Sequence, residues 1–167
     1  MNALTRITSG LLAGLVLGLG GHPVHAHGEA ADAHAAPSPA YPAASAGTRT
    51  LVAGPVSIKM LLDASNLGQD DIEIGELFLP AGFGESGAHQ HGSLEIFYVV
   101  EGVLGHEVNG ISHRLEPGMV GFVKPGDAVN HQVLSDGPMR ALVIWLPGGE
   151  AGRLLEHAGF TEQPVTE

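Results

Sequence analysis

Turn-forming residues interrupt the chain at short, regular intervals from about residue 50 onward. Pairs such as those at 109–110, 117–118 and 125–126 are typical of turns, and the turn signals recur roughly every 8–12 residues. The segments between them are apolar or alternating and are too short for ordinary helices. This spacing predicts an all-β domain, either a sandwich or a barrel. Strands are expected at 56–63, 72–79, 94–101, 103–108, 111–115, 119–123, 130–134 and 139–146, with a loop at 66–71 and one short helix at 149–157.

The pair Asn109-Gly110 is the strongest hairpin signal in the chain, because a two-residue turn there requires positive φ at both positions. Such a turn places His106 directly opposite His113 on the apolar face of the hairpin. Two interpretations of this pair are open. It is either a pair of hydrogen-bonded core histidines or a polar floor beneath a functional site that relays protons.

The first part of the chain has the features of a secretory signal peptide. An apolar, glycine-broken stretch at residues 7–21 follows a single positive side chain, and a small-x-small cleavage site ends at Ala26. Residues 1–26 are therefore predicted to be removed on export to the periplasm or the medium, the alternative being an uncleaved membrane anchor. Residues 27–49 are mostly Ala, Pro, Ser, Gly and His, a composition that predicts a disordered tether. The folded domain is expected to cover residues 50–167.

The charge and the absence of cysteine narrow the possible partners and cofactors. The formal net charge is −11 with seven Lys and Arg residues, so the surface repels phosphates. We therefore expect no nucleic-acid partner and no membrane partner after cleavage of the signal. Because the chain contains no cysteine, any metal must be held by histidine, carboxylate or backbone groups.

Three histidines and one glutamate form a candidate metal site. His89 and His91 point the same way if residues 89–91 are extended, because alternate side chains of a strand share a face. Glu95 shares its strand face with apolar residues, where a carboxylate is unfavourable unless a positive group holds it. His131 lies on the strand after the turn at 124–127. Three imidazoles and a carboxylate suit one divalent transition metal, Fe, Mn, Ni, Cu or Zn.

The same residues carry a resemblance to the cupin superfamily. Residues 87–95 read Gly-Ala-His-Gln-His-Gly-Ser-Leu-Glu and are followed after six residues by Gly102, which resembles the first cupin motif. Gly118, the Lys-Pro-Gly run at 124–126 and His131 resemble the second. The resemblance implies a single jelly-roll β-barrel with a short C-terminal helix and a metal in the mouth of the barrel. Cupins include dioxygenases, decarboxylases, isomerases, lyases and binding proteins, so the fold does not select the reaction.

Three functional hypotheses follow. The favoured one is a metal-dependent, dioxygenase-like enzyme that acts on a small oxygen-bearing molecule, with Glu95, the only carboxylate expected to point inward, as ligand and candidate general base. A cavity lined by Phe97, Val99, Phe122 and Val133 would favour a hydrophobic or aromatic substrate. The alternative is a non-catalytic metal- or ligand-binding cupin. The third is an interaction protein or homodimer that pairs through strand edges, for which an apolar strand such as residues 56–63 could serve.

Two further segments have open roles. If cleavage follows Ala26, His27 becomes the N-terminal residue, and its amino group and imidazole could chelate Cu or Ni together with His34. The alternative is an unstructured tail that happens to contain histidine. Residues 147–160 either close the mouth of the barrel or form a surface cap.

Overall fold

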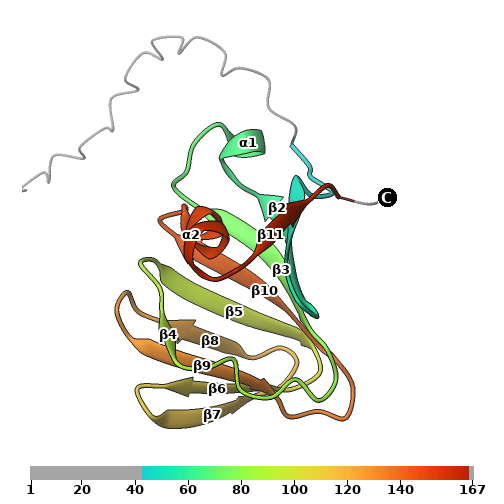
Figure 1. The fold of residues 1–167 in the computed structure, drawn as a ribbon, viewed down its shortest axis with the longest axis vertical. Coiled ribbons are helices and arrows are strands. Elements are labelled where there is room, and N and C mark those ends of the chain that lie inside the picture. Colours follow the sequence, from blue (N-terminus) through green and yellow to red (C-terminus); the bar gives the residue numbers. More distant parts are fainter. Residues whose placement is uncertain (1–42, 166–167) are drawn as a thin grey trace, which may run out of the picture. The chain divides into compact units, whose positions relative to one another are not determined.

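The computed structural model describes residues 43–165, so the predicted signal and most of the predicted tether lie outside the described residues. This part of the chain forms mainly strands (Figure 1). They are β1 (Arg49–Ala53), β2 (Val56–Leu62), β3 (Glu73–Leu79), β4 (His89–Gln90), β5 (Leu94–Glu101), β6 (Leu104–Val108), β7 (Ile111–Leu115), β8 (Val120–Val123), β9 (Ala128–Val133), β10 (Met139–Leu146) and β11 (Thr161–Gln163). The helices are α1 (Ala64–Leu67) and α2 (Glu150–His157). Neither helix is long and apolar enough to cross a bilayer.

The strands form two antiparallel sheets. The larger sheet has the order β11-β1-β2-β3-β10-β5-β8, and the smaller one has the order β4-β9-β6-β7. Neighbours in space are mostly far apart in sequence, as in the pairing of β10 with both β3 and β5. This arrangement confirms the predicted all-β jelly roll with a short C-terminal helix.

The buried side chains lie between the two sheets. Phe97 of the larger sheet contacts the rings of His106 and His131 of the smaller sheet, with ring centroids 5.8 and 4.8 Å away. These contacts place two histidines inside the core of the sandwich. The surrounding apolar residues include Leu51, Ile58, Met60, Leu77, Leu79, Val99, Leu104, Leu115, Met139, Ala141, Val143 and Trp145.

The predicted hairpin register is confirmed. Asn109 and Gly110 both have positive φ, 51° and 79°, as a two-residue primed turn requires. His106 pairs with His113 across β6 and β7. The strand expected at residues 130–134 is also present, although β9 starts two residues earlier.

Two predictions about the first strands are wrong. Residues 66–71 were expected to be a loop, but α1 extends to Leu67. Asp63 caps this helix by accepting a hydrogen bond from the backbone N–H of Ser65, while the Asn66 side chain accepts one from the backbone N–H of Asp63. The segment 56–63 is not an exposed edge either, because β2 lies between β1 and β3. The edges of the larger sheet are β11 and β8.

Candidate functional site

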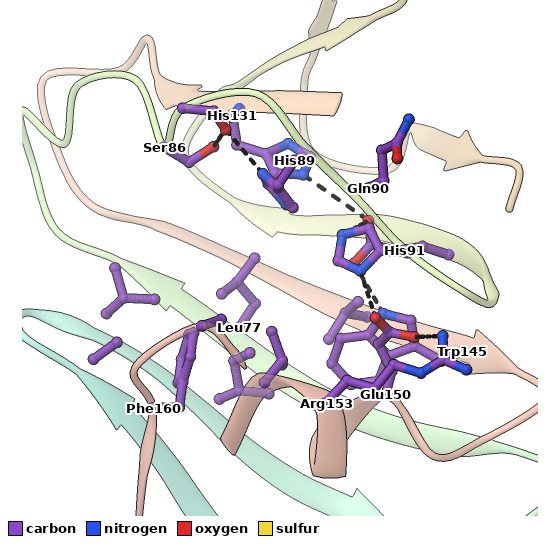
Figure 2. A pocket seen from close by; sticks show the side chains of 18 of the residues that line it. Leu77, Ser86, His89, Gln90, His91, His131, Trp145, Glu150, Arg153 and Phe160 are labelled. Atoms are coloured by element: carbon purple, nitrogen blue, oxygen red, sulfur yellow. Dashed lines mark hydrogen bonds and ion pairs between the residues drawn. The ribbon is translucent and has the colours of Figure 1, made fainter. Parts of the chain in front are cut away.

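Figure 2 shows three of the four predicted ligands, His89, His91 and His131, close together at the pocket. Distances to Glu95 place the fourth beside them. Nε2 of His91 lies 3.1 Å from Oε2 of Glu95, and Nε2 of His131 lies 4.0 Å from the same oxygen. The ring of His89 is centred 4.9 Å from that of His91 and 5.8 Å from that of His131. The structure therefore brings together all four side chains from β4, β5, β9 and the segment after β4.

Hydrogen bonds to β9 and its preceding turn hold the His-x-His segment in place. His89 and Gln90 of β4 pair antiparallel with Val129 and Ala128 of β9. Beyond the strand, the carbonyl oxygen of His91 accepts a hydrogen bond from the N–H of Gly126 at 3.1 Å. Nδ1 of His89 lies 2.9 Å from the carbonyl oxygen of Gly87, to which it can donate, and this leaves the lone pair of Nε2 free for another partner.

Buried polar atoms without partners mark the centre of the group. Nε2 of His91 and Oε2 of Glu95 are buried and have only each other, 3.1 Å apart, and both ring nitrogens of His131 are buried with no hydrogen-bond partner among the described residues. Each such atom costs about 1–3 kcal/mol unless something satisfies it. Within residues 43–165 no three His, Asp or Glu side chains are arranged closely enough to hold a metal ion together. The donor set nevertheless fits a cation, because nitrogen lone pairs and a carboxylate oxygen are what a divalent transition metal takes.

Trp145 positions Glu95. Trp145 is the direct neighbour of Glu95 across β5 and β10, and its indole N–H donates to Oε1 of Glu95 at 2.9 Å. Both side chains are almost fully buried. One carboxylate oxygen is therefore held by the indole, and the other, Oε2, is directed toward the histidines.

Glu150 positions His91. Nδ1 of His91 donates to Oε1 of Glu150 at 3.0 Å, so Nε2 is turned toward Glu95. Burial lowers the pKa of His91, but the hydrogen-bonded carboxylates of Glu150 and Glu95 outweigh it and raise that pKa to about 9. Burial alone would raise the pKa of Glu150. The hydrogen bond from His91 and the positive charges of His91 and Arg153 outweigh burial, so the pKa of Glu150 is lowered. A carboxylate that fixes the far nitrogen of a ligating histidine is a common companion of metal sites.

A further buried carboxylate fixes the helix that carries Glu150. Oε2 of Glu73, on β3, accepts a hydrogen bond at 2.9 Å from the backbone N–H of Ala151, in the first turn of α2. Glu73 and Glu150 are both almost completely buried. The prediction that Glu95 is the only inward carboxylate is therefore wrong. Sequence patterns missed Glu150 because it lies outside both motifs, more than fifty positions from His91.

His131 stays neutral in this environment. Burial lowers the pKa of His131 well below its usual range, and the nearby His106, His89 and His91 lower it further. A neutral imidazole is the form that binds a metal. The loop before β4 also holds His131, because the hydroxyl of Ser86 accepts a hydrogen bond from the His131 backbone N–H at 3.0 Å.

His106 and His113 do not form the expected core pair. His106 is buried, stacks on His131 with ring centroids 5.3 Å apart and an interplanar angle of 18°, and has its pKa lowered by burial. His113 is exposed, with its ring centred 6.4 Å from that of His106. The core-pair interpretation is wrong for His113, because β7 is the outer strand of the smaller sheet. His106 lies beneath a predicted ligand, as the polar-floor interpretation required.

A cavity of about 680 Å³ opens onto the four predicted ligands. Helix α2 contributes Glu150, Arg153, Leu154 and His157 to its wall, so the C-terminal segment borders this cavity. The predicted apolar lining is correct only for Phe97. Val99 and Val133 do not line the cavity, and Phe122 is 58% exposed because it points outward from the edge strand β8. The apolar wall consists instead of Ala53, Val56, Ile58, Leu77, Leu79, Phe83, Val143, Leu154 and Phe160.

Comparisons with known proteins agree with this fold. Residues 75–145 match the model of the cupin domain family. A protein of Thermotoga maritima described as a predicted oxalate decarboxylase has a TM-score of 0.53 and 20% identity, over 61% of this chain and 94% of that chain. KdgF from Halomonas sp. has a TM-score of 0.52 and 20% identity, over 60% of this chain and 86% of that chain. An RmlC-like cupin from Shewanella frigidimarina has a TM-score of 0.52 and 21% identity, over 63% of this chain and 88% of that chain.

The match and the fold together identify the class. Residues 75–145 of this chain form a cupin domain. At 20–21% identity the solved structures are evidence for the fold alone. A comparison with curated protein sequences gives no match.

Proposed function

We propose that this protein is an exported cupin that binds one divalent transition metal through His89, His91, Glu95 and His131. The observation that carries the proposal is a buried group in which Nε2 of His91 and Oε2 of Glu95 have only each other, while Nε2 of His131 has no partner and lies 4.0 Å from the same oxygen. A structure that left these atoms unsatisfied would be destabilised at each of them. A cation bound to the two nitrogens and the oxygen would satisfy them, in place of the proton that His91 otherwise holds.

The residues around these ligands support the same role. Glu150 holds His91 by its far nitrogen, Gly87 holds His89, and Trp145 holds Glu95 by its second oxygen. Such partners fix the orientation of ligands, and their loss commonly lowers metal affinity 10–100-fold. They have no comparable use in a site made only of solvated polar side chains.

We propose further that the protein is a metal-dependent enzyme, dioxygenase-like or of another Lewis-acid type, that acts on a small oxygen-bearing molecule. The bound metal would polarise a substrate oxygen or hold O₂ beside the substrate. The cavity of about 680 Å³ falls within the size range of small-molecule sites. Its apolar wall suits a hydrophobic or aromatic substrate. Glu95 would balance the charge of the metal, and it could accept a proton only if Oε2 left the metal when substrate binds.

The alternative is a cupin that binds metal or ligand without turnover. The bond from Trp145 favours it, because this bond restrains Glu95 from leaving the metal to act as a base. The two candidates differ in what the cavity does to a bound molecule. Incubation with phenolic or enolic substrates separates the two candidates. O₂ uptake and product analysis then show whether the protein turns the substrate over or only binds it.

Elemental mass spectrometry tests the metal site. The chain is purified without an affinity tag, and bound Fe, Mn, Ni, Cu and Zn are measured per chain for the wild type, His89→Ala and His27→Ala. We expect about one ion in the wild type and in His27→Ala, and a large loss in His89→Ala. His27→Ala also tests whether the predicted tether binds the metal. Absence of metal from the wild type, even after reconstitution, would overturn the proposal.

A further inference from the structure

Arg153 is the one lysine or arginine among the described residues that line the cavity. It lies one helical turn after Glu150 on α2, and its Nη1 donates to Oε2 of Glu150 at 3.2 Å. Its side chain is 51% exposed, so the guanidinium lies at the mouth rather than in the core. In a chain with only seven Lys and Arg residues, a cation at this place is a feature that needs a reason.

Gly92 makes room for this guanidinium. A Cβ atom at position 92 would overlap Nη1 of Arg153 and crowd the rest of the guanidinium. The side chain of Arg153 therefore lies directly against the backbone between His91 and Ser93. The hydrogen bond between Glu73 and Ala151 fixes the start of α2, which carries the backbone of Arg153. The contact with Gly92 limits where its guanidinium can lie.

The remaining donors of Arg153 are available to a ligand. A guanidinium has five N–H donors in a planar fork that matches a carboxylate. Glu150 takes one of them through Oε2, and its other oxygen is already bonded to His91. By contrast, the exposed Arg140 is shared between two carboxylates, those of Glu76 and Glu101.

The charges of the cavity favour an anion. A divalent metal and Arg153 together exceed the two buried carboxylates, Glu95 and Glu150, by one positive charge. One carboxylate on a ligand would balance it. The strongly negative remainder of the chain would repel such an acid elsewhere, so its binding depends on this local excess.

The other side of the cavity is apolar. Figure 2 shows Leu77 and Phe160 on one side of the cavity and Arg153 with Glu150 on the other. Ile58, Leu79, Phe83 and Val143 extend the apolar wall. A molecule that fills this space must offer an aliphatic or aromatic body to the wall and a negative group to Arg153.

We infer that the cavity takes small amphipathic carboxylic acids, with the carboxylate bound by Arg153 and the apolar body lying against the wall around Leu77 and Phe160. The inference rests on the proposed function and deepens it, because it names the substrate class of the same site. Arg153 acts here as a specificity-determining residue, and Gly92 as the residue that positions it.

Matched probes test this inference by binding. We would titrate 3-phenylpropionate and its uncharged amide, 3-phenylpropionamide, into the full chain by calorimetry, both after chelator treatment and after loading with Zn²⁺. The Zn²⁺-loaded wild type is expected to bind the acid at least about tenfold more tightly than the amide. After chelator treatment this preference should shrink, because removing the ion also removes the excess positive charge of the cavity. Arg153→Gln should remove this preference, and Arg153→Lys should retain part of it. Arg140→Gln makes the same charge change outside the cavity and should behave as the wild type.

Gly92→Ala provides a second test that keeps the charge. The added methyl group meets only the flexible end of Arg153, so the variant should fold with unchanged thermal stability and lose most of the preference for the acid. Equal binding of acid and amide by the wild type, no binding of the acid, or a full preference in Arg153→Gln or Gly92→Ala would overturn the inference. Metal content is measured on the same samples. Loss of the preference with metal still bound refutes the inference alone, whereas absence of metal refutes the proposed function.

Discussion

His131 and His113 occupy equivalent positions on either side of His106. Both are direct cross-strand neighbours of His106, one on β9 and the other on β7. His131 is 6% exposed and has two unpartnered ring nitrogens, whereas His113 is exposed. The same residue type, in the same register and on the same sheet, thus belongs to the core in one case and to the surface in the other.

The difference lies in what covers each strand. β9 lies between β4 and β6, and Phe97 of the opposite sheet packs on the His131 ring. β7 is the outer strand of the smaller sheet and has a neighbour on one side only. Pairing register decides which face a side chain takes, and the position of the strand within the sheet decides whether that face is buried.

The largest effect expected from this difference is on metal content. His131→Ala removes a ligand and should reduce bound metal to near the background, while His113→Ala should leave it at the wild-type level. Elemental analysis of the two variants side by side checks this. Equal losses of metal in both variants would mean that His113, His106 and His131, which are neighbours on the smaller sheet, hold the metal rather than the predicted four ligands.

A smaller effect is expected from the residue that orients Glu95. Trp145→Phe leaves Oε1 of Glu95 without its donor while keeping an aromatic ring in the core, and should weaken metal binding about 10–100-fold. Competition with a chelator of known affinity measures the change. His106→Phe, which alters a neighbour that contacts no predicted ligand oxygen, is the comparison. Unchanged affinity in Trp145→Phe would show that the indole does not orient the carboxylate.

A similar but milder change is expected at α2. Glu150→Gln keeps an acceptor for the N–H of His91 but removes the charge, and should weaken metal binding about tenfold. Glu156→Gln is the matched control, since Glu156 is on the same helix and 72% exposed. The chelator competition should place Glu156→Gln with the wild type, and a loss of affinity in both variants would indicate a general charge effect.

The smallest effect is expected at the hairpin turn. Gly110→Ala places a Cβ atom at φ 79°, which costs about 1–2 kcal/mol. The thermal midpoint should fall by several degrees, with metal content unchanged because β6 and β7 contribute no predicted ligand. Calorimetry and elemental analysis of the same sample check both points. Loss of metal in this variant would mean that the hairpin carrying His113 contributes to metal binding.

Much of the fold could be predicted because its signals are local. The turn at Asn109-Gly110 specifies both a pair of strands and their register, and the His-x-His segment specifies a shared face. Glu95 was predictable as a ligand because a carboxylate on an apolar strand face needs a partner. The four-residue helix α1 was missed because it is too short to show a helical period.

The supporting parts of the site depend on contacts between distant segments. Glu150 meets His91 and Trp145 meets Glu95 only after the sheets have assembled, and neither pair has a sequence spacing that would reveal it. The exposure of His113 likewise depends on which strand lies at the edge of the smaller sheet. Phe122 is exposed because it lies on the outer face of β8, whereas its neighbour Val123 points inward and is fully buried.

Anomalous X-ray diffraction from crystals of the metal-loaded protein, measured at the absorption edge of the bound metal, tests the central claim most directly. We expect one strong peak within ligand distance, about 2.0–2.2 Å, of the nitrogens of His91 and His131 and of Oε2 of Glu95, with His89 completing the set. A peak at His113, or none within the cavity of a chain that carries metal in solution, would contradict the proposed site.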